Sequence, residues 1–189
     1  MDKLLDKIVN KQLSDGVISK EDVPVYRYGY LLLFETLANI VAGIVVGVLF
    51  QQLCVVFIFW IGYMPLRSYA GGWHASTFFK CFLVSNLWLI IAVVVIKFFE
   101  VPINIWTIIV DALCILIICV LSPVDTESKP LDTEERKKYK AKTIVILITH
   151  IVIICIWKKV WEILICVHVI LAIALMAQCI KNRKCRRER

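Results

Sequence analysis

The sequence lacks the cysteine arrangements that a zinc site or a redox pair would need. It contains eight cysteines, but none forms a CxxC pair and none stands at zinc-ligand spacing from a histidine. Six of the eight lie in or beside apolar stretches, where cysteine behaves as a small hydrophobic residue. We therefore expect no metal, no cofactor and no disulfide framework, with Cys81 and Cys185 facing the reducing cytoplasm.

The sequence also has no secretory signal pattern, no internal repeat and no low-complexity segment. Residues 1–27 carry lysines and acids throughout, so no apolar core precedes a cleavage site. Hydrophobic residues nevertheless make up 60% of the 189 residues, and the mean hydropathy is +0.81. Soluble domains are about 45–50% apolar. The composition therefore predicts an integral membrane protein with one domain, residues 1–189.

Apolar runs long enough to cross a bilayer, about 17–25 residues, divide the chain. The clear runs are Tyr30–Phe50, Cys81–Phe99, Ile103–Leu121 and Val160–Ile180, and two shorter runs are Leu53–Leu66 and Ile144–Trp157. The short runs either cross as thin or tilted helices or re-enter the membrane. We predict an all-α, polytopic transmembrane bundle of about six segments. Four crossings remain the alternative if neither short run crosses.

Basic residues are concentrated in four segments between and beyond these runs. They hold 19 of the 22 lysines and arginines, in residues 1–29, 67–80, 122–142 and 181–189. The other three, Lys97, Lys158 and Lys159, fall at the opposite ends of the runs. Six crossings place all four basic segments on one side, which the positive-inside rule makes the cytoplasm. This distribution predicts a multi-pass protein of the cell membrane with both termini inside, and it explains the net charge of +7 without nucleic acid.

Three polar segments flank the membrane runs. Residues 2–14 form an amphipathic helix with a basic face, which serves either as a membrane-surface anchor or as an apolar surface for a substrate helix. The loop 122–142 is a solvated linker or, in its second half, a helix that starts at Asp132 or Thr133. The tail 181–189 is a polybasic stop that binds anionic lipid.

The stretch RSYAGGWHASTFFKC, residues 67–81, combines groups that could perform chemistry. On one continuous helix His74 and Cys81 would stand about 10 Å apart along the axis. Gly71 and Gly72 favour a break, so that His74 lies on a loop that folds back and Ser76 or Thr77 caps a new helix. Cys81 then occupies the early turns, where the helix N-terminus and the nearby cations Arg67 and Lys80 stabilise a thiolate. The pattern suits a Cys–His nucleophile pair. The simpler alternative is an interfacial histidine and a cysteine that only packs.

The stretch resembles the core motif of the accessory gene regulator B family, membrane cysteine endopeptidases of bacterial peptide quorum sensing. In that motif an arginine precedes Gly-Gly, one residue and a histidine, with a cysteine seven residues after the histidine. A second element of the family resembles SPVDTESKPL. The residues that match the two elements are Arg67, Gly71, Gly72, His74 and Cys81 in the first and Ser122, Pro123, Lys129 and Pro130 in the second. Chain length, hydropathy and the basic tail are similar as well.

The resemblance implies a substrate and a mechanism. The substrate would be a short precursor peptide with an amphipathic leader, a central cysteine or serine and an acidic tail. Cys81 would attack the bond before the tail, His74 would act as base and then acid, and the central residue would close a thiolactone or lactone ring. By charge alone, the residues that could hold the tail are Arg67, Lys80, Lys129 and the cluster 136–142. The resemblance also makes a homodimer plausible.

Several other polar residues have open roles. Asp125, Glu35 and Asn86 are the candidates to orient His74, and none is preferred. Asp111 lies within a membrane run, where an acid is expected to be functional, or it faces the bundle interior or the outer leaflet.

His150 and His168 lie within the last two runs, where we expect them to pack as polar residues. The main alternative to a peptidase is a small transporter or peptide-export component that uses Asp111, His150, His168 and Glu35 as a polar path. A scaffold for a sensor kinase is a further alternative.

Overall fold

The structure, a computed structural model, describes residues 2–71, 78–124 and 132–187, and its regular elements in these ranges are all helices. Seven α-helices and one 3-10 helix follow one another, and no strand occurs among the described residues. The all-α prediction is confirmed. The helices are α1 (Asp2–Ser14), α2 (Val23–Leu49), α3 (Leu53–Ala70), α4 (Phe78–Phe98), α5 (Ile105–Leu121), α6 (Thr133–Ile156), η1 (Lys158–Val160) and α7 (Trp161–Arg187).

Five helices are long and apolar enough to cross a membrane, and α5 is a shorter apolar helix of 17 residues. The six apolar helices correspond to the six predicted segments, so the polytopic architecture is confirmed. The prediction of which segments are short was wrong, because α3 has 18 residues and α6 has 24. Both helices continue beyond their apolar runs into polar sequence, α3 to Ala70 and α6 from Thr133. Hydropathy records only the apolar part of such a helix.

The start of α6 follows the predicted local chemistry. Asp132 precedes the helix, and its carboxylate accepts a hydrogen bond from the backbone N–H of Glu135 at 2.7 Å. Glu134 and Glu135 then occupy the first turn, where acids interact favourably with the helix dipole. The second half of the long polar loop is therefore the first part of a membrane-length helix.

The chain divides into two compact units, Met1–Gly43 and Ile44–Arg189, which we call unit 1 and unit 2. In unit 1 the predicted amphipathic segment is the helix α1. Arg27 Nε lies 2.9 Å from the Asp6 carboxylate, and Gln12 donates a hydrogen bond to the Tyr30 hydroxyl, so side chains join α1 to α2. Leu5 and Val9 on the apolar face of α1 are each 1% exposed. Protein therefore covers this part of the apolar face.

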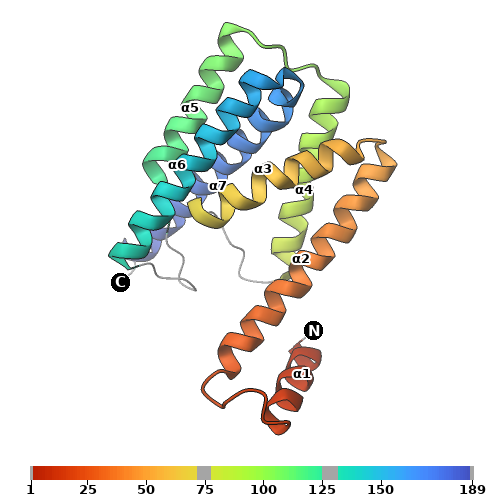
Figure 1. Ribbon diagram of the computed structural model, residues 1–189, viewed down its shortest axis with the longest axis vertical. Coiled ribbons are helices and arrows are strands. Elements are labelled where there is room, and N and C mark those ends of the chain that lie inside the picture. The colour runs from red at the N-terminus through yellow and green to blue at the C-terminus, as the bar shows by residue number, and fades with distance from the viewer. Residues whose placement is uncertain (1, 72–77, 125–131, 188–189) are drawn as a thin grey trace. The chain divides into compact units, whose positions relative to one another are not determined.

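Unit 2 is a helical bundle organised around α7. In the apolar stretch of α7, 56% of the residues are buried. In the apolar stretches of the other four long helices, only 11% to 28% are buried. Figure 1 shows α5, α6 and α7 side by side, with α3 crossing them obliquely. A helix that is apolar on all sides lies either among other helices or in lipid, and α7 is the helix that lies mostly among others. Its contribution to the core comprises Ile163, Val167, Ile170, Leu171, Ala172 and Leu175.

Two contacts relate the ends of the helices in unit 2. The backbone N–H of Val124, just beyond α5, donates to the carbonyl of Ala70, the last residue of α3, at 3.1 Å. Lys97, near the end of α4, donates from Nζ to the carbonyl of Phe50 at 2.9 Å. The two polar loops that follow α3 and α5 therefore begin at the same end of unit 2, as the charge pattern requires.

Candidate active site

Cys81 lies at the start of α4, in the first turn of the helix. It is the fourth residue of α4 and only 8% exposed. The prediction that Cys81 occupies the early turns of a new helix is confirmed. Backbone N–H groups of a first helical turn lack partners within the helix, so this position favours a negative charge. Its predicted partner His74, Gly72 and the candidate caps Ser76 and Thr77 lie outside the described residues.

Gly71 ends α3 and provides the predicted break. Its φ of 83° and ψ of −158° lie in a region that essentially only glycine adopts, and its N–H donates to the carbonyl of Arg67 at 2.9 Å. A Cβ on Gly71 would stand 2.6 Å from the carbonyl oxygen of Val124, which is too close for a non-bonded contact. Both the backbone conformation and the close approach of Val124 therefore require glycine here.

The end of α3 and the segment after α5 form a loop junction, which we define as Ala70, Gly71, Ser122, Pro123 and Val124. The hydrogen bond from Val124 to Ala70 closes it, and the Ser122–Pro123 peptide bond is cis. Ser122 is buried, and its hydroxyl has no hydrogen-bond partner among the described residues. The junction thus places Gly71 of the first sequence motif beside Val124 of the second, SPVDTESKPL. Sequence spacing did not predict this contact.

Two cations of α6 hold the backbone of the junction. Lys140 Nζ donates to the carbonyl of Ser122 at 2.8 Å and also to the carbonyl of Cys119. Arg136 donates to the carbonyl of Pro123 at 3.3 Å. The last carbonyls of a helix have no partners within it, and cations are favourable there. Lys140 and Arg136, which by charge were candidates for holding an acidic peptide, thus bind this protein's own backbone.

Two other cations lie beside aromatic rings near the same end of unit 2. Arg67 donates to the Tyr63 hydroxyl at 3.0 Å and lies 5.8 Å from the centre of that ring. Lys142 Nζ lies 4.6 Å from the centre of the Tyr69 ring, which packs edge-on against Tyr139. These distances fit cation–π contacts. The other candidates Lys129 and Pro130 lie outside the described residues, and Lys80 is exposed on the first turn of α4.

The three candidates for orienting His74 have different outcomes. Asp125 lies outside the described residues, and Glu35 belongs to unit 1. Asn86 is on α4, where its side chain donates to the carbonyl of Phe82 at 2.8 Å. The role of orienting His74 therefore stays a prediction for each of the three.

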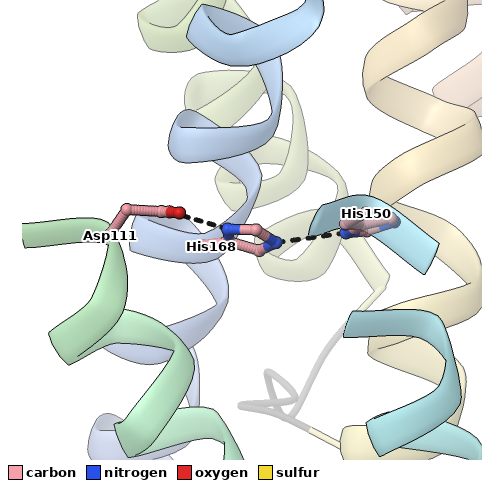
Figure 2. A network of polar contacts seen from close by, with 3 residues as sticks. All are labelled: Asp111, His150 and His168. Atoms are coloured by element: carbon pink, nitrogen blue, oxygen red, sulfur yellow. Dashed lines mark hydrogen bonds and ion pairs between the residues drawn. The ribbon is translucent and has the colours of Figure 1, made fainter. Parts of the chain in front are cut away.

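A second polar group, which we call the Asp–His–His network, lies inside unit 2. His168 Nδ1 of α7 stands 2.7 Å from the carboxylate of Asp111 on α5, and His168 Nε2 stands 3.1 Å from Nδ1 of His150 on α6. Figure 2 shows the three side chains in line, with His168 in the middle. The exposed fractions are 6%, 0% and 5% for Asp111, His168 and His150.

The network corrects how these three residues are read from the sequence. The sequence left open which way Asp111 faces, and it favoured packing for the two histidines, with a shared polar path as the alternative. The structure places Asp111 in the bundle interior, paired with His168, and not on the membrane-facing surface. The only signal in the sequence is that each is an ionisable residue within an apolar run. Nothing in local spacing says that the three face one another.

Comparisons with known proteins identify a family and relatives of this chain. The profile of the family described as Accessory gene regulator B matches residues 1–181. A protein of Clostridium perfringens strain SM101 named AgrB-like is 28% identical over 93% of this chain and 88% of its own length. An AgrB-like protein of Listeria innocua is 31% identical over 72% of this chain and 71% of its own.

A third relative bears the family name itself. The accessory gene regulator protein B of Staphylococcus carnosus is 26% identical over 62% of this chain and 61% of its own length. No solved structure matches the chain.

Proposed function

Because the chain belongs to the accessory gene regulator B family, we propose that it is a membrane cysteine endopeptidase that matures a quorum-sensing peptide. The observation that carries the proposal is the position of Cys81. Its side chain is nearly buried in the first turn of α4, directly after the segment that leaves the loop junction at Gly71. The N-terminus of a helix stabilises the thiolate form of a cysteine, which is the nucleophile in such a peptidase.

The proposed reaction has two acyl transfers. His74 removes the proton from Cys81, and the thiolate attacks the carbonyl carbon of the peptide bond before the acidic tail. The C–N bond breaks, His74 returns the proton to the amine of the departing tail, and a thioester to Cys81 remains. The central cysteine or serine of the precursor then attacks the thioester while His74 takes its proton. The ring closes, the bond to Cys81 breaks, and His74 passes the proton to the departing Cys81 sulfur.

Shelter from water is important for the second step. Exchange of a thioester for a thiolactone conserves the energy of the acyl bond, whereas attack by water loses it. A site that excludes water limits this side reaction. Cys81 is 8% exposed and begins a membrane-length helix, so the intermediate would be held at the edge of a low-water region.

The substrate in this proposal is a precursor peptide with an amphipathic leader and an acidic tail. Lys137 and Lys138 are exposed on the first turns of α6, next to the cations that hold the loop junction. They are available to attract the acidic tail, whereas Arg136 and Lys140 already bind backbone carbonyls. The site would face the cytoplasm, where the positive-inside rule places the basic loops.

The test is cleavage of a candidate precursor by purified protein in liposomes, followed by mass spectrometry. We expect wild-type protein to release the acidic tail and a cyclic product, and Cys81→Ala and His74→Ala each to lower the rate by about a thousandfold or more. Cys155→Ala is the matched control, because Cys155 is an exposed cysteine of α6. We expect its rate to equal that of wild type. Undiminished cleavage by Cys81→Ala would rule out the proposed nucleophile.

A second candidate function is a small transporter or peptide-export component. It is favoured by one observation: Asp111, His150 and His168, which a polar path would use, meet inside unit 2. This function requires that Asp111→Asn stop movement of a labelled peptide across a liposome membrane while Cys81→Ala does not. The peptidase requires that Cys81→Ala abolish processing.

A further inference from the structure

The proposed peptidase reaction leaves the Asp–His–His network without a role. Its three residues come from α5, α7 and α6, and none is more than 6% exposed. Ionisable side chains are costly inside a membrane protein unless they are paired, so such a group calls for a physical account. Figure 2 shows that each polar group faces the next one in line.

The geometry fixes how hydrogen atoms are arranged in the network. An ionised Asp111 only accepts, so His168 must donate to it from Nδ1. One nitrogen of the contact between His168 Nε2 and His150 Nδ1 must carry a hydrogen and the other must not, because two donors or two acceptors would repel. With two neutral rings the network holds one hydrogen on each ring and a net charge of −1.

A third hydrogen removes this net charge. It places an imidazolium beside the Asp111 carboxylate, and the line of hydrogen bonds lets either ring carry the charge. A buried charge without compensation is strongly unfavourable, whereas a paired and hydrogen-bonded one is tolerated. We propose that Asp111, His168 and His150 form one proton-binding site, which takes up a single proton and shares it between the two rings.

Among the described residues, the only ion pair that the network makes is the one between His168 and Asp111. On α5, Cys114 interacts electrostatically with Asp111, and on α7 Cys166 interacts with Glu162. Gly62 of α3 lies beside the His150 ring, because a Cβ on Gly62 would stand 3.8 Å from His150 Cε1. No group of described residues is arranged to hold a metal ion. A proton is therefore the ligand that fits the site.

The chain contains only three histidines, which makes a direct measurement feasible. In protein labelled with ¹⁵N-histidine and carrying His74→Gln, the only imidazole signals come from His150 and His168. NMR in lipid nanodiscs from about pH 9 to about pH 5 then counts the protonated ring nitrogens. We expect the two rings to change together in one step, from two protonated nitrogens to three.

The isosteric variant Asp111→Asn tests the role of the carboxylate. It can accept the same hydrogen bond from His168 but lacks the charge, so we expect its proton uptake to move to a pH lower by about one unit or more, a tenfold loss of proton affinity. Thr143→Val is the matched control, because Thr143 is also buried on α6 but bonds only to the Tyr139 carbonyl. We expect it to leave the step where it is.

Three results would overturn the proposal. They are two protonated nitrogens over the whole range, two separate steps that belong to one ring each, or the same step in Asp111→Asn as in the parent. The first two results are measured in the parent protein, which retains Asp111. The proposal can therefore be tested even if Asp111→Asn does not fold. The measurement uses no peptide, and its outcome is therefore separate from that of the peptidase proposal.

Discussion

The loop junction and the Asp–His–His network both connect separate helices through polar groups, but the partners of those groups differ. Each joins polar groups from helices that are distant in the sequence. At the junction, exposed Arg136 and half-buried Lys140 bind backbone carbonyls beyond and at the end of α5. In the network, side chains bind only side chains, and His168 is 0% exposed.

The difference follows from access to water. A cation at the end of a bundle keeps part of its hydration, so its bond to a carbonyl contributes modestly and its loss is tolerated. A carboxylate inside the bundle has no water to replace a lost partner, so every member of the network depends on the others. Four substitutions test this comparison, in order of decreasing effect.

Asp111→Leu should have the largest effect on stability. It leaves His168 Nδ1–H without a partner in the interior, and we expect the free energy of unfolding to fall by about 3 kcal/mol. Asp111→Asn, which keeps an acceptor, should cost about 1 kcal/mol. Reversible unfolding in mixed detergent micelles measures both, and equal losses would contradict the dependence on an acceptor.

Gly71→Ala should destabilise the loop junction by about 2 kcal/mol, since it adds backbone strain and a clash with Val124. Gly16→Ala is the matched control, because Gly16 also has a positive φ of 72° but nothing within 4 Å of a Cβ. We expect about 1 kcal/mol there. The same unfolding assay separates strain from the clash. A loss for Gly71→Ala no greater than for Gly16→Ala would show that Val124 gives way.

Lys140→Met should lower the free energy of unfolding by about 1 kcal/mol, because two carbonyls lose a charged donor that is already partly hydrated. Lys140→Arg should restore most of it. Lys138→Met serves as the control, since its ion pair with Glu134 is 3.9 Å long and highly exposed and should contribute less than about 0.5 kcal/mol. If both methionine variants behave alike, Lys140 does not hold the junction.

The double variant Lys137→Gln and Lys138→Gln should leave stability unchanged and weaken only substrate capture. We expect KM for the acidic precursor to rise about threefold to tenfold at low salt, and the difference from wild type to vanish at high salt. Cleavage rates across a salt series provide the measurement. A lower kcat with unchanged KM would place these lysines in another role.

Much of the fold could be predicted from local sequence. The apolar runs identify six apolar helices, Gly71 ends α3, Asp132 caps α6, and Cys81 lies in the first turn of α4. Each of these depends on residues within a few positions of one another. The length of α3 and α6 was missed, because a helix does not stop where its residues become polar.

The sequence by itself determined a helical membrane bundle, the basic loops and the resemblance that points to Cys81 and His74. Hydropathy, capping and glycine preferences are local properties, so they can be read along the chain. Only the tertiary structure decided that Val124 meets Ala70 and that Asp111, His168 and His150 form one line. Helix packing sets which faces meet, and three largely apolar helices can pack in many rotations. The pairing of those polar residues is a property of the assembled bundle.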